Sequence, residues 1–464
     1  MAMIALATPM AESTQPIPSA RAGARPPAWR SPRVACAALF LAVFVPASAL
    51  IIYYVRGRPF QTDSLYYLQC ASVMWRHGEF AQNPGAPLAK DHVAYVMFLA
   101  PFVGLLGPQP LAALFVQALL AGAGAILVFG MARRLGGDVA GWAAGLLYAS
   151  YAPVVVFPAQ FVTETLTIFG LLCIVWVNDR MFRAETVSAA ARWGALLGAL
   201  CALTAHVRMI AFPLVAAPAG LYALYALAAR RQPARAAIVA GACLGAFALA
   251  WSPWVIRNQI TFGRPIVLIT GLDQTRTATH RVAEMIEQGH EIEAARTTVK
   301  EEMFGPAPPI DGAGGPEPAL PKAPRTMEAS GPPSFTTRAR HCAQRLLIML
   351  GLHPKVDAPY PLTGNTVSRL PVVRWAMMGW NRLLLALCAV ALLGSLARRD
   401  LAWFNTLAIP GALITLYALV HAIPRYQIPS FAALTIPAGV AVARMIDAFH
   451  GAGRARAMGC GDKA

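Results

Sequence analysis

Charged side chains are scarce in this chain of 464 residues, and acidic ones are the scarcest. Only 13% of the residues are charged and 57% are hydrophobic, whereas a soluble domain has about 25% charged residues. Lys and Arg number 39 and Asp and Glu only 22, so the formal net charge is +17. In a soluble protein this charge would indicate binding to nucleic acid. The sequence, however, has no basic segment with interleaved aromatic residues of the kind that binds nucleic acid. In so apolar a chain, basic residues instead mark the cytoplasmic ends of membrane helices.

Several catalytic motifs are also absent. The sequence contains no GxxxxGK[ST] phosphate loop, no GxGxxG after a strand, no HExxH and no GxSxG. Its 8 cysteines form no CxxC pair and no Cys/His cluster at zinc spacing. These absences argue against a P-loop enzyme, a dinucleotide enzyme, a zinc protease and an α/β-hydrolase.

Long apolar runs dominate what remains. A hydrocarbon core of about 30 Å needs about 20 apolar residues to cross it as a helix. The sequence therefore predicts an all-α, polytopic integral membrane protein of about ten transmembrane helices with outer-face loops. The predicted spans are 34–55, 110–132, 139–157, 161–178, 190–207, 210–229, 236–256, 373–396, 401–420 and 427–448.

One further apolar stretch, Val93 to Leu106, has only about 14 residues, which is typical of a re-entrant or interfacial segment. The distribution of arginines tests whether it crosses, because an extra crossing would move every later loop to the other side. If it does not cross, one side collects most of the basic loops, including Arg133–Arg134 and Arg398–Arg399, and the opposite short loops hold Arg208 and Arg425. We therefore place this segment in the outer interface of the plasma membrane, with both termini cytoplasmic.

This topology divides the chain into five parts. The outer-face loop contains the Pro/Gly-rich stretch 305–333, which cannot easily bury a core. Cys70 and Cys342 both fall outside the membrane and are candidates for a disulfide, whose geometry the sequence does not specify. The parts are a disordered cytoplasmic tail (1–33), a transmembrane catalytic module (34–256) with its outer loop (56–109), an outer-face loop (257–371), C-terminal transmembrane helices (372–448) and a cytoplasmic tail (449–464).

The first outer loop opens with QTDSLYYLQCASVMWRHGEF. In it, Tyr66, Tyr67, Cys70 and Met74 follow Asp63 at the spacing of one helical face. The pattern predicts a helix that lies along the membrane with Asp63 at its start. The alternative to a catalytic role is that Thr62 or Asp63 only caps this helix.

A second acid, Glu164, occurs in FPAQFVTETLTIFGLL in the first turn of the fourth span, on the same side as Asp63. An acid at this position is also favoured by the helix dipole alone. If the two acids converge, one can serve as a base and the other as an orienting or metal-binding group. The sequence leaves open whether a divalent metal ion takes part.

Further polar and basic residues fall on the outer side. Each arginine there has the alternative of reaching for phospholipid head groups. Four arginines on the face with fewer positive charges nevertheless favour a phosphate or pyrophosphate ligand, because guanidinium groups match phosphate geometry. These residues are His206 and Arg208 in ALTAHVRMIAFP, Arg257, Asn258 and Arg264 in WSPWVIRNQITFGRPI, and His421, Arg425 and Tyr426 in HAIPRYQIPSF.

Taken in order over roughly residues 35 to 450, these motifs resemble the membrane-embedded GT-C glycosyltransferases. The resemblance is carried by TDSLYYLQCA, the short apolar segment, a span that ends in ARRLGG, TETLTIF, the PWVIRNQITFGRPI block and PRYQIP. It is strongest to the bacterial branch similar to aminoarabinose transferases and to the protein O-mannosyltransferases. The sequence departs from the family at DHVAYVMF, which replaces a proline-rich start of the re-entrant segment.

The resemblance implies transfer of a sugar from a polyprenyl-phosphate donor to a lipid, glycan or protein acceptor on the outer face of the plasma membrane. It implies that Asp63 is the catalytic carboxylate and that Glu164 is the second acid. The lipid phosphate would be held by arginines, and the neighbouring polar groups would bind substrate. The predicted substrate-binding residues are Tyr66, Tyr67, His206, Arg208, Arg257, Arg264, Arg425 and Tyr426, of which the resemblance implies the arginines.

Two other functions remain open. A transporter or flippase of a lipid-linked or anionic solute would need charges near the membrane midplane and broken helices. Here the polar groups cluster at the outer ends of the predicted spans, which favours an enzyme at the interface. A structural subunit with a degenerate site is the third hypothesis, and the presence of Asp63 and Glu164 argues against it.

Overall fold

The computed structural model describes residues 31–55, 62–89, 92–228, 231–268, 371–398, 401–420 and 427–459, with a few isolated positions between 285 and 350. Within these ranges the structure is helical and contains no strand, only one isolated bridge between Ala81 and Pro87. The predicted all-α fold class is therefore confirmed for the described part of the chain. The linker 305–333 lies outside it, as do residues 1–30 and 460–464 of the predicted tails. Residues 449–459, predicted as tail, instead continue the last helix, α15 (Ile428–Gly459).

The helices agree closely with the predicted apolar runs. α14 has the bounds predicted for its span, and α3 has those of the short interfacial segment. The elements are α1 (Pro32–Val55), α2 (Thr62–His77), α3 (Val93–Leu106), α4 (Leu111–Ala149), α5 (Ala152–Val156), η2 (Phe157–Ala159), α6 (Glu164–Arg183), α7 (Val187–Val207), η3 (Met209–Val215), α8 (Ala216–Ala228), α9 (Pro233–Phe262), α13 (Pro371–Arg398), α14 (Leu401–Val420) and α15 (Ile428–Gly459).

The number of spans differs from the predicted ten. Among the described residues, 7 helices are long and apolar enough to cross a membrane. One of them, α4, covers residues 111–132 of one predicted span and 139–149 of the next. The described apolar parts of α13 and α14, Gly379–Gly394 and Thr406–Thr415, are shorter than a span. The structure thus establishes a polytopic helical architecture without confirming the count of ten.

α4 reverses direction at two glycines. Gly136 and Gly137 have non-helical backbone angles, and Gly137 has a φ of 80°, which favours glycine because it has no Cβ. The Tyr148 hydroxyl lies 3.4 Å from the Ala121 carbonyl oxygen, so the second half of α4 runs back along the first. The two predicted spans are therefore antiparallel halves of one element. The second half ends at Ala149, not at 157 as predicted, because α5 and η2 follow it.

α15 forms the centre of the bundle. Its side chains are buried on all sides from residue 428 to 441, and it packs against α4, α6, α13 and α14. Small residues permit the close approach: a Cβ on Gly439 would lie 2.4 Å from the backbone nitrogen of Ala144 in α4. Likewise, a Cβ on Gly198 in α7 would lie 1.9 Å from the Cys243 carbonyl oxygen in α9. Such glycines are typical of helix contacts in membranes.

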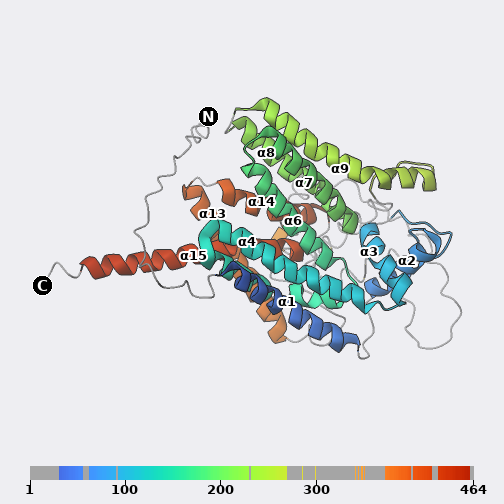
Figure 1. The fold of residues 1–464 in the computed structure, drawn as a ribbon, viewed down its shortest axis with the longest axis horizontal. Coiled ribbons are helices and arrows are strands. Elements are labelled where there is room, and N and C mark those ends of the chain that lie inside the picture. The colour runs from blue at the N-terminus through green and yellow to red at the C-terminus, as the bar shows by residue number, and fades with distance from the viewer. Residues whose placement is uncertain are drawn as a thin grey trace.

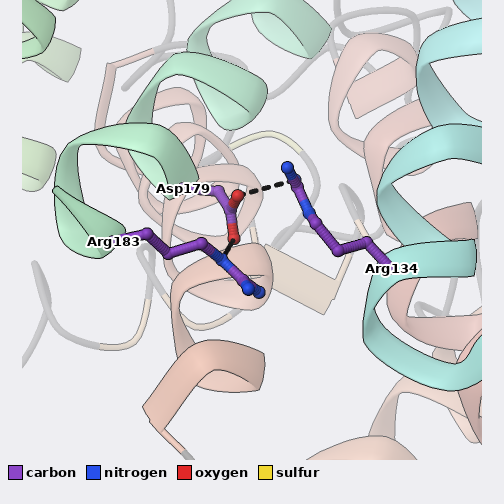
Figure 2. Close-up of polar contacts among 3 residues, drawn as sticks. All are labelled: Arg134, Asp179 and Arg183. Carbon is purple, nitrogen blue, oxygen red and sulfur yellow. Dashed lines mark hydrogen bonds and ion pairs between the residues drawn. The ribbon is translucent and has the colours of Figure 1, made fainter.

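The bundle has two distinct ends. Figure 1 shows α2, α3 and the last turns of α9 gathered at one end, which we call the α2 end, while α15 projects beyond the other. The turn of α4 lies at that second end, which we call the Gly137 end. There Arg134 of α4 and Arg183 of α6 both contact Asp179 of α6 (Figure 2), with nitrogen–oxygen distances of 2.6 and 2.9 Å. The Arg134–Asp179 ion pair joins α4 to α6.

Candidate functional site

Asp63 lies in the first turn of α2, and its side chain is exposed. One helical turn later Tyr67 is buried, with its ring 5.4 Å from the His92 ring and 5.1 Å from the Tyr95 ring, both edge-on. Tyr66 is partly buried against Tyr67. The predicted helical face therefore exists and packs on α3, and it leaves Asp63 accessible at the start of the helix.

Glu164 has very different surroundings. It lies in the first turn of α6, as predicted, but its side chain is completely buried. Its Oε1 lies 3.2 Å from Nη1 of Arg208, which connects α7 to η3 and is itself buried. Both residues were predicted for the site from sequence, but their pairing was not. Glu164 thus forms a buried ion pair with Arg208.

Three residues near this ion pair were not assigned a role by sequence. The Tyr95 hydroxyl donates to Oε1 of Gln117 in α4 at 3.2 Å, and the Gln117 amide donates to the Gln160 carbonyl oxygen at 2.9 Å. His92 Nδ1 lies 2.9 Å from the Val207 carbonyl oxygen. A signal for Gln117 was present, because a lone amide within an apolar run is costly in a membrane and needs partners.

The Tyr95 hydroxyl is a persistent donor. Burial raises the pKa of Tyr95 well above its usual range, and the nearby negative charge of Glu164 raises it further. Ionisation of the phenol is therefore suppressed, and the protonated hydroxyl donates to Gln117.

Arg257, which was predicted to bind phosphate, contacts backbone carbonyl groups in this structure. Its Nη1 donates to the Leu88 carbonyl oxygen at 2.6 Å, and its Nη2 donates to the Phe80 carbonyl oxygen at 3.4 Å. These carbonyls belong to the turn that follows α2, and the Phe80 ring also contacts Trp254 of α9. Arg257 therefore joins the first outer loop to the end of α9.

Two more of the predicted substrate-binding residues, His206 and Arg264, lie within the described part of the chain. His206 stacks on Trp251 of α9, with ring centroids 4.1 Å apart and an interplanar angle of 12°. Arg264 is exposed just after α9. Arg425, Tyr426 and His421 lie outside the described residues, as does Cys342, the predicted partner of Cys70.

The described residues contain no group of three or more His, Cys, Asp and Glu side chains arranged to hold a metal ion. This observation leaves metal dependence untested. Of the two predicted acids, only Asp63 combines a carboxylate with an exposed side chain, since Glu164 is buried against Arg208.

Comparison with known proteins identifies the class of fold. No family model matches the sequence, and no curated protein matches it. Solved structures do match, and they share the helical membrane fold of this chain.

The particular neighbours are two crystal structures of ArnT from Cupriavidus metallidurans. The structure bound to undecaprenyl phosphate matches with a TM-score of 0.54 and 13% sequence identity, and the apo structure with a TM-score of 0.51 and 14% identity. Each alignment covers 88% of this chain and 60% of the ArnT chain. At this identity the similarity concerns the fold, and the chain spans about 60% of the length of its neighbours.

Proposed function

We propose that the protein is an inverting membrane glycosyltransferase, which moves a hexosyl or pentosyl group from a polyprenyl-phosphate carrier to a lipid, glycan or protein acceptor. The main support is the accessible carboxylate of Asp63 at the α2 end of a fold shared with an ArnT structure that holds undecaprenyl phosphate. The burial of Tyr67 against α3 supports the same proposal, because it gives the helix that carries Asp63 a defined position.

In the proposed reaction Asp63 acts as the general base. It accepts the proton of the acceptor hydroxyl as that oxygen attacks the anomeric carbon of the sugar. The bond between this carbon and the phosphate oxygen breaks, and its electron pair leaves with the polyprenyl phosphate. Arg264 and Arg425 are the proposed partners of the leaving phosphate, because fixed cations stabilise the negative charge that develops there.

The remaining predicted residues take supporting roles in this proposal. Glu164 forms a buried ion pair with Arg208, and we assign this pair to shaping the site beneath the substrates. Arg257 holds the turn after α2, so we expect it to contact phosphate only if that turn moves. Tyr66, Tyr67, His206 and Tyr426 are proposed to line the site. No step requires a metal ion.

We also propose where the protein lies in the cell. We place the protein in the plasma membrane with both termini in the cytoplasm, and the α2 end at the outer face, because of the arginine distribution in the sequence. Donor and acceptor would then meet at the outer membrane–water interface.

The test begins with mass spectrometry of envelope lipids, glycans and glycoproteins from cells that lack the gene, which identifies the missing sugar. The purified protein is then assayed with that donor and acceptor. We expect Asp63→Asn to lower kcat by about 10²–10⁴-fold, because the amide cannot accept the proton. Its stability should change by no more than about 1 kcal/mol, because the side chain is exposed and the change removes mainly the favourable interaction of an acid with the first turn of α2.

A matched control is Glu79→Gln, in the same outer loop. The Glu79 carboxylate accepts a hydrogen bond from the Gly85 backbone nitrogen at 2.9 Å, in the turn after α2. We expect this variant to keep the wild-type rate. Transfer by Asp63→Asn at the wild-type rate would remove the catalytic assignment. Movement of the lipid across vesicles by wild type, without any sugar transfer, would favour the flippase instead.

A further inference from the structure

The start of α3 binds the chain segment that leads into Arg208. His92, just before α3, has a φ of 76°, a conformation that is uncommon for residues other than glycine. In this position its Nδ1 lies 2.9 Å from the carbonyl oxygen of Val207, the residue that immediately precedes Arg208. Arg208 of the buried ion pair is therefore linked to the start of α3 through the carbonyl group of the residue before it.

The first turn of α3 also reaches the segment that leads into Glu164. The Tyr95 hydroxyl binds Gln117, and the Gln117 amide binds the carbonyl oxygens of Gln160, at 2.9 Å, and of Pro158, at 3.4 Å. Gln160 lies four residues before Glu164 in the sequence. Tyr95, Gln117 and Gln160 are all buried, so these hydrogen bonds do not compete with water.

α3 makes a third contact, with the helix that carries Asp63. The Tyr95 ring packs edge-on against Tyr67 of α2, and the two helices approach closely enough that a Cβ on Gly104 would lie 2.1 Å from the Trp75 ring. Tyr67 lies one turn after Asp63. Tyr95 is thus in contact with the Asp63 helix on one side and, through Gln117, with the Glu164 segment on the other.

We propose that Tyr95 is a positioning residue: through its ring contact with Tyr67 and its hydrogen bond to Gln117, it holds Asp63 in register with the Glu164–Arg208 ion pair. The proposal rests on the proposed glycosyl transfer, in which Asp63 is the base. Tyr95 touches no reacting atom in this scheme. Its hydroxyl matters because displacement of a reacting group by about 1 Å can lower a rate about 10²-fold.

The main experiment compares Tyr95→Phe with the wild-type protein in detergent or nanodiscs. We expect kcat to fall by about 10- to 100-fold, while KM for the donor changes by less than about threefold, because binding groups are retained and geometry is lost. Hydrogen–deuterium exchange of peptides from α2 should become faster, because the hydrogen-bonded support of the ring that holds Tyr67 is lost.

Tyr148→Phe is the matched control. The Tyr148 hydroxyl is also buried and also donates to a polar oxygen, that of Ala121, but it links the two halves of α4. We expect this variant to lose stability without a change in kcat or in exchange of α2. An equal loss of kcat in both variants would show a general effect of buried tyrosine hydroxyls and would overturn the proposal.

A second variant tests the link itself. Gln117→Met removes the amide that connects Tyr95 to Gln160, and we expect it to lower kcat about as much as Tyr95→Phe. Because both changes break one chain of hydrogen bonds, the double variant should be little worse than either single one. Additive losses, or unchanged exchange of α2 in Tyr95→Phe, would overturn the positioning role.

The two proposals fail in different ways. If the wild-type protein transfers no sugar, the proposed function fails, whereas the exchange measurement still reports whether Tyr95 holds α2. If the wild-type protein is active and Tyr95→Phe retains its kcat, only the positioning role fails.

Discussion

α6 carries an acidic residue near each end, and each pairs with arginine in a different environment. At the α2 end, Glu164 is 0% exposed and Arg208 6% exposed, and the pair is separated by 3.2 Å. At the Gly137 end, Asp179 is 9% exposed and shared by Arg134 and Arg183, which are 25% and 46% exposed (Figure 2). An ion pair between an acidic residue of α6 and arginine therefore occurs once in the interior of the protein and once with partly exposed arginines.

The difference indicates different purposes. In a buried ion pair, the attraction between the ions must offset the loss of hydration of both. Such a pair therefore often adds little to the free energy of unfolding compared with apolar residues in its place. The Asp179 cluster keeps part of its hydration and joins α4 to α6. Its arginines belong to the basic side of the chain, which the sequence predicts to be cytoplasmic. We interpret the Asp179 cluster as a helix clamp. The Glu164–Arg208 pair, in contrast, lies among the residues of the candidate site, where a defined position matters more than stability.

The largest effect on stability is expected from breaking the buried pair. Arg208→Leu leaves the Glu164 carboxylate buried without its cation, and should lower the free energy of unfolding by about 3–5 kcal/mol. Thermal unfolding in detergent measures the loss. Glu164→Gln combined with Arg208→Leu should recover most of it, because no buried charge remains. A single-variant loss below about 1 kcal/mol would show that Glu164 has other sufficient support.

A smaller effect is expected at the Gly137 end. Asp179→Asn removes the carboxylate shared by Arg134 and Arg183, and should cost about 1–2 kcal/mol, between the values for exposed and buried pairs. Part of this loss should disappear in 1 M salt, because partly exposed charges are screened. The loss caused by Arg208→Leu should not depend on salt. Equal salt dependence of the two losses would contradict the distinction drawn between the two ends.

The smallest effect is expected for Arg183→Ala. Arg183 is about half exposed and pairs with Asp179 within one helix, so after allowance for solvent screening the pair should contribute only about 0.3–0.5 kcal/mol. Arg134 still holds Asp179 in this variant. Unfolding measured in parallel with Asp179→Asn provides the comparison. A loss as large as that of Asp179→Asn would assign the clamp to Arg183 and not to Arg134.

Much of the fold was predictable because apolar runs decide which segments become membrane helices. The bounds of α3 and α14 agree with the predicted ones, and α4 turns at the predicted ARRLGG segment. The end of the span predicted as 139–157 was wrong, because the apolar pattern continues through α5 and η2 although the helix ends at Ala149. Hydropathy measures apolarity and is insensitive to a short break in the helix.

The candidate site was predictable only as a set of residues. The sequence identified Asp63, Glu164 and Arg208, since polar residues at the ends of apolar runs stand out. It did not indicate that Asp63 is exposed or that Glu164 is buried against Arg208. Accessibility and pairing depend on neighbours that are distant in the sequence.

The sequence by itself determined that this is a polytopic helical membrane protein with a basic side, because length, apolarity and arginine distribution act locally along the chain. Only the tertiary structure decided that α3 joins α2 to the ion pair, through Tyr95 and Gln117. Contacts of this kind depend on how α2, α3 and α4 pack together. The apolar pattern along the sequence does not specify which side chains meet across the interfaces between these helices.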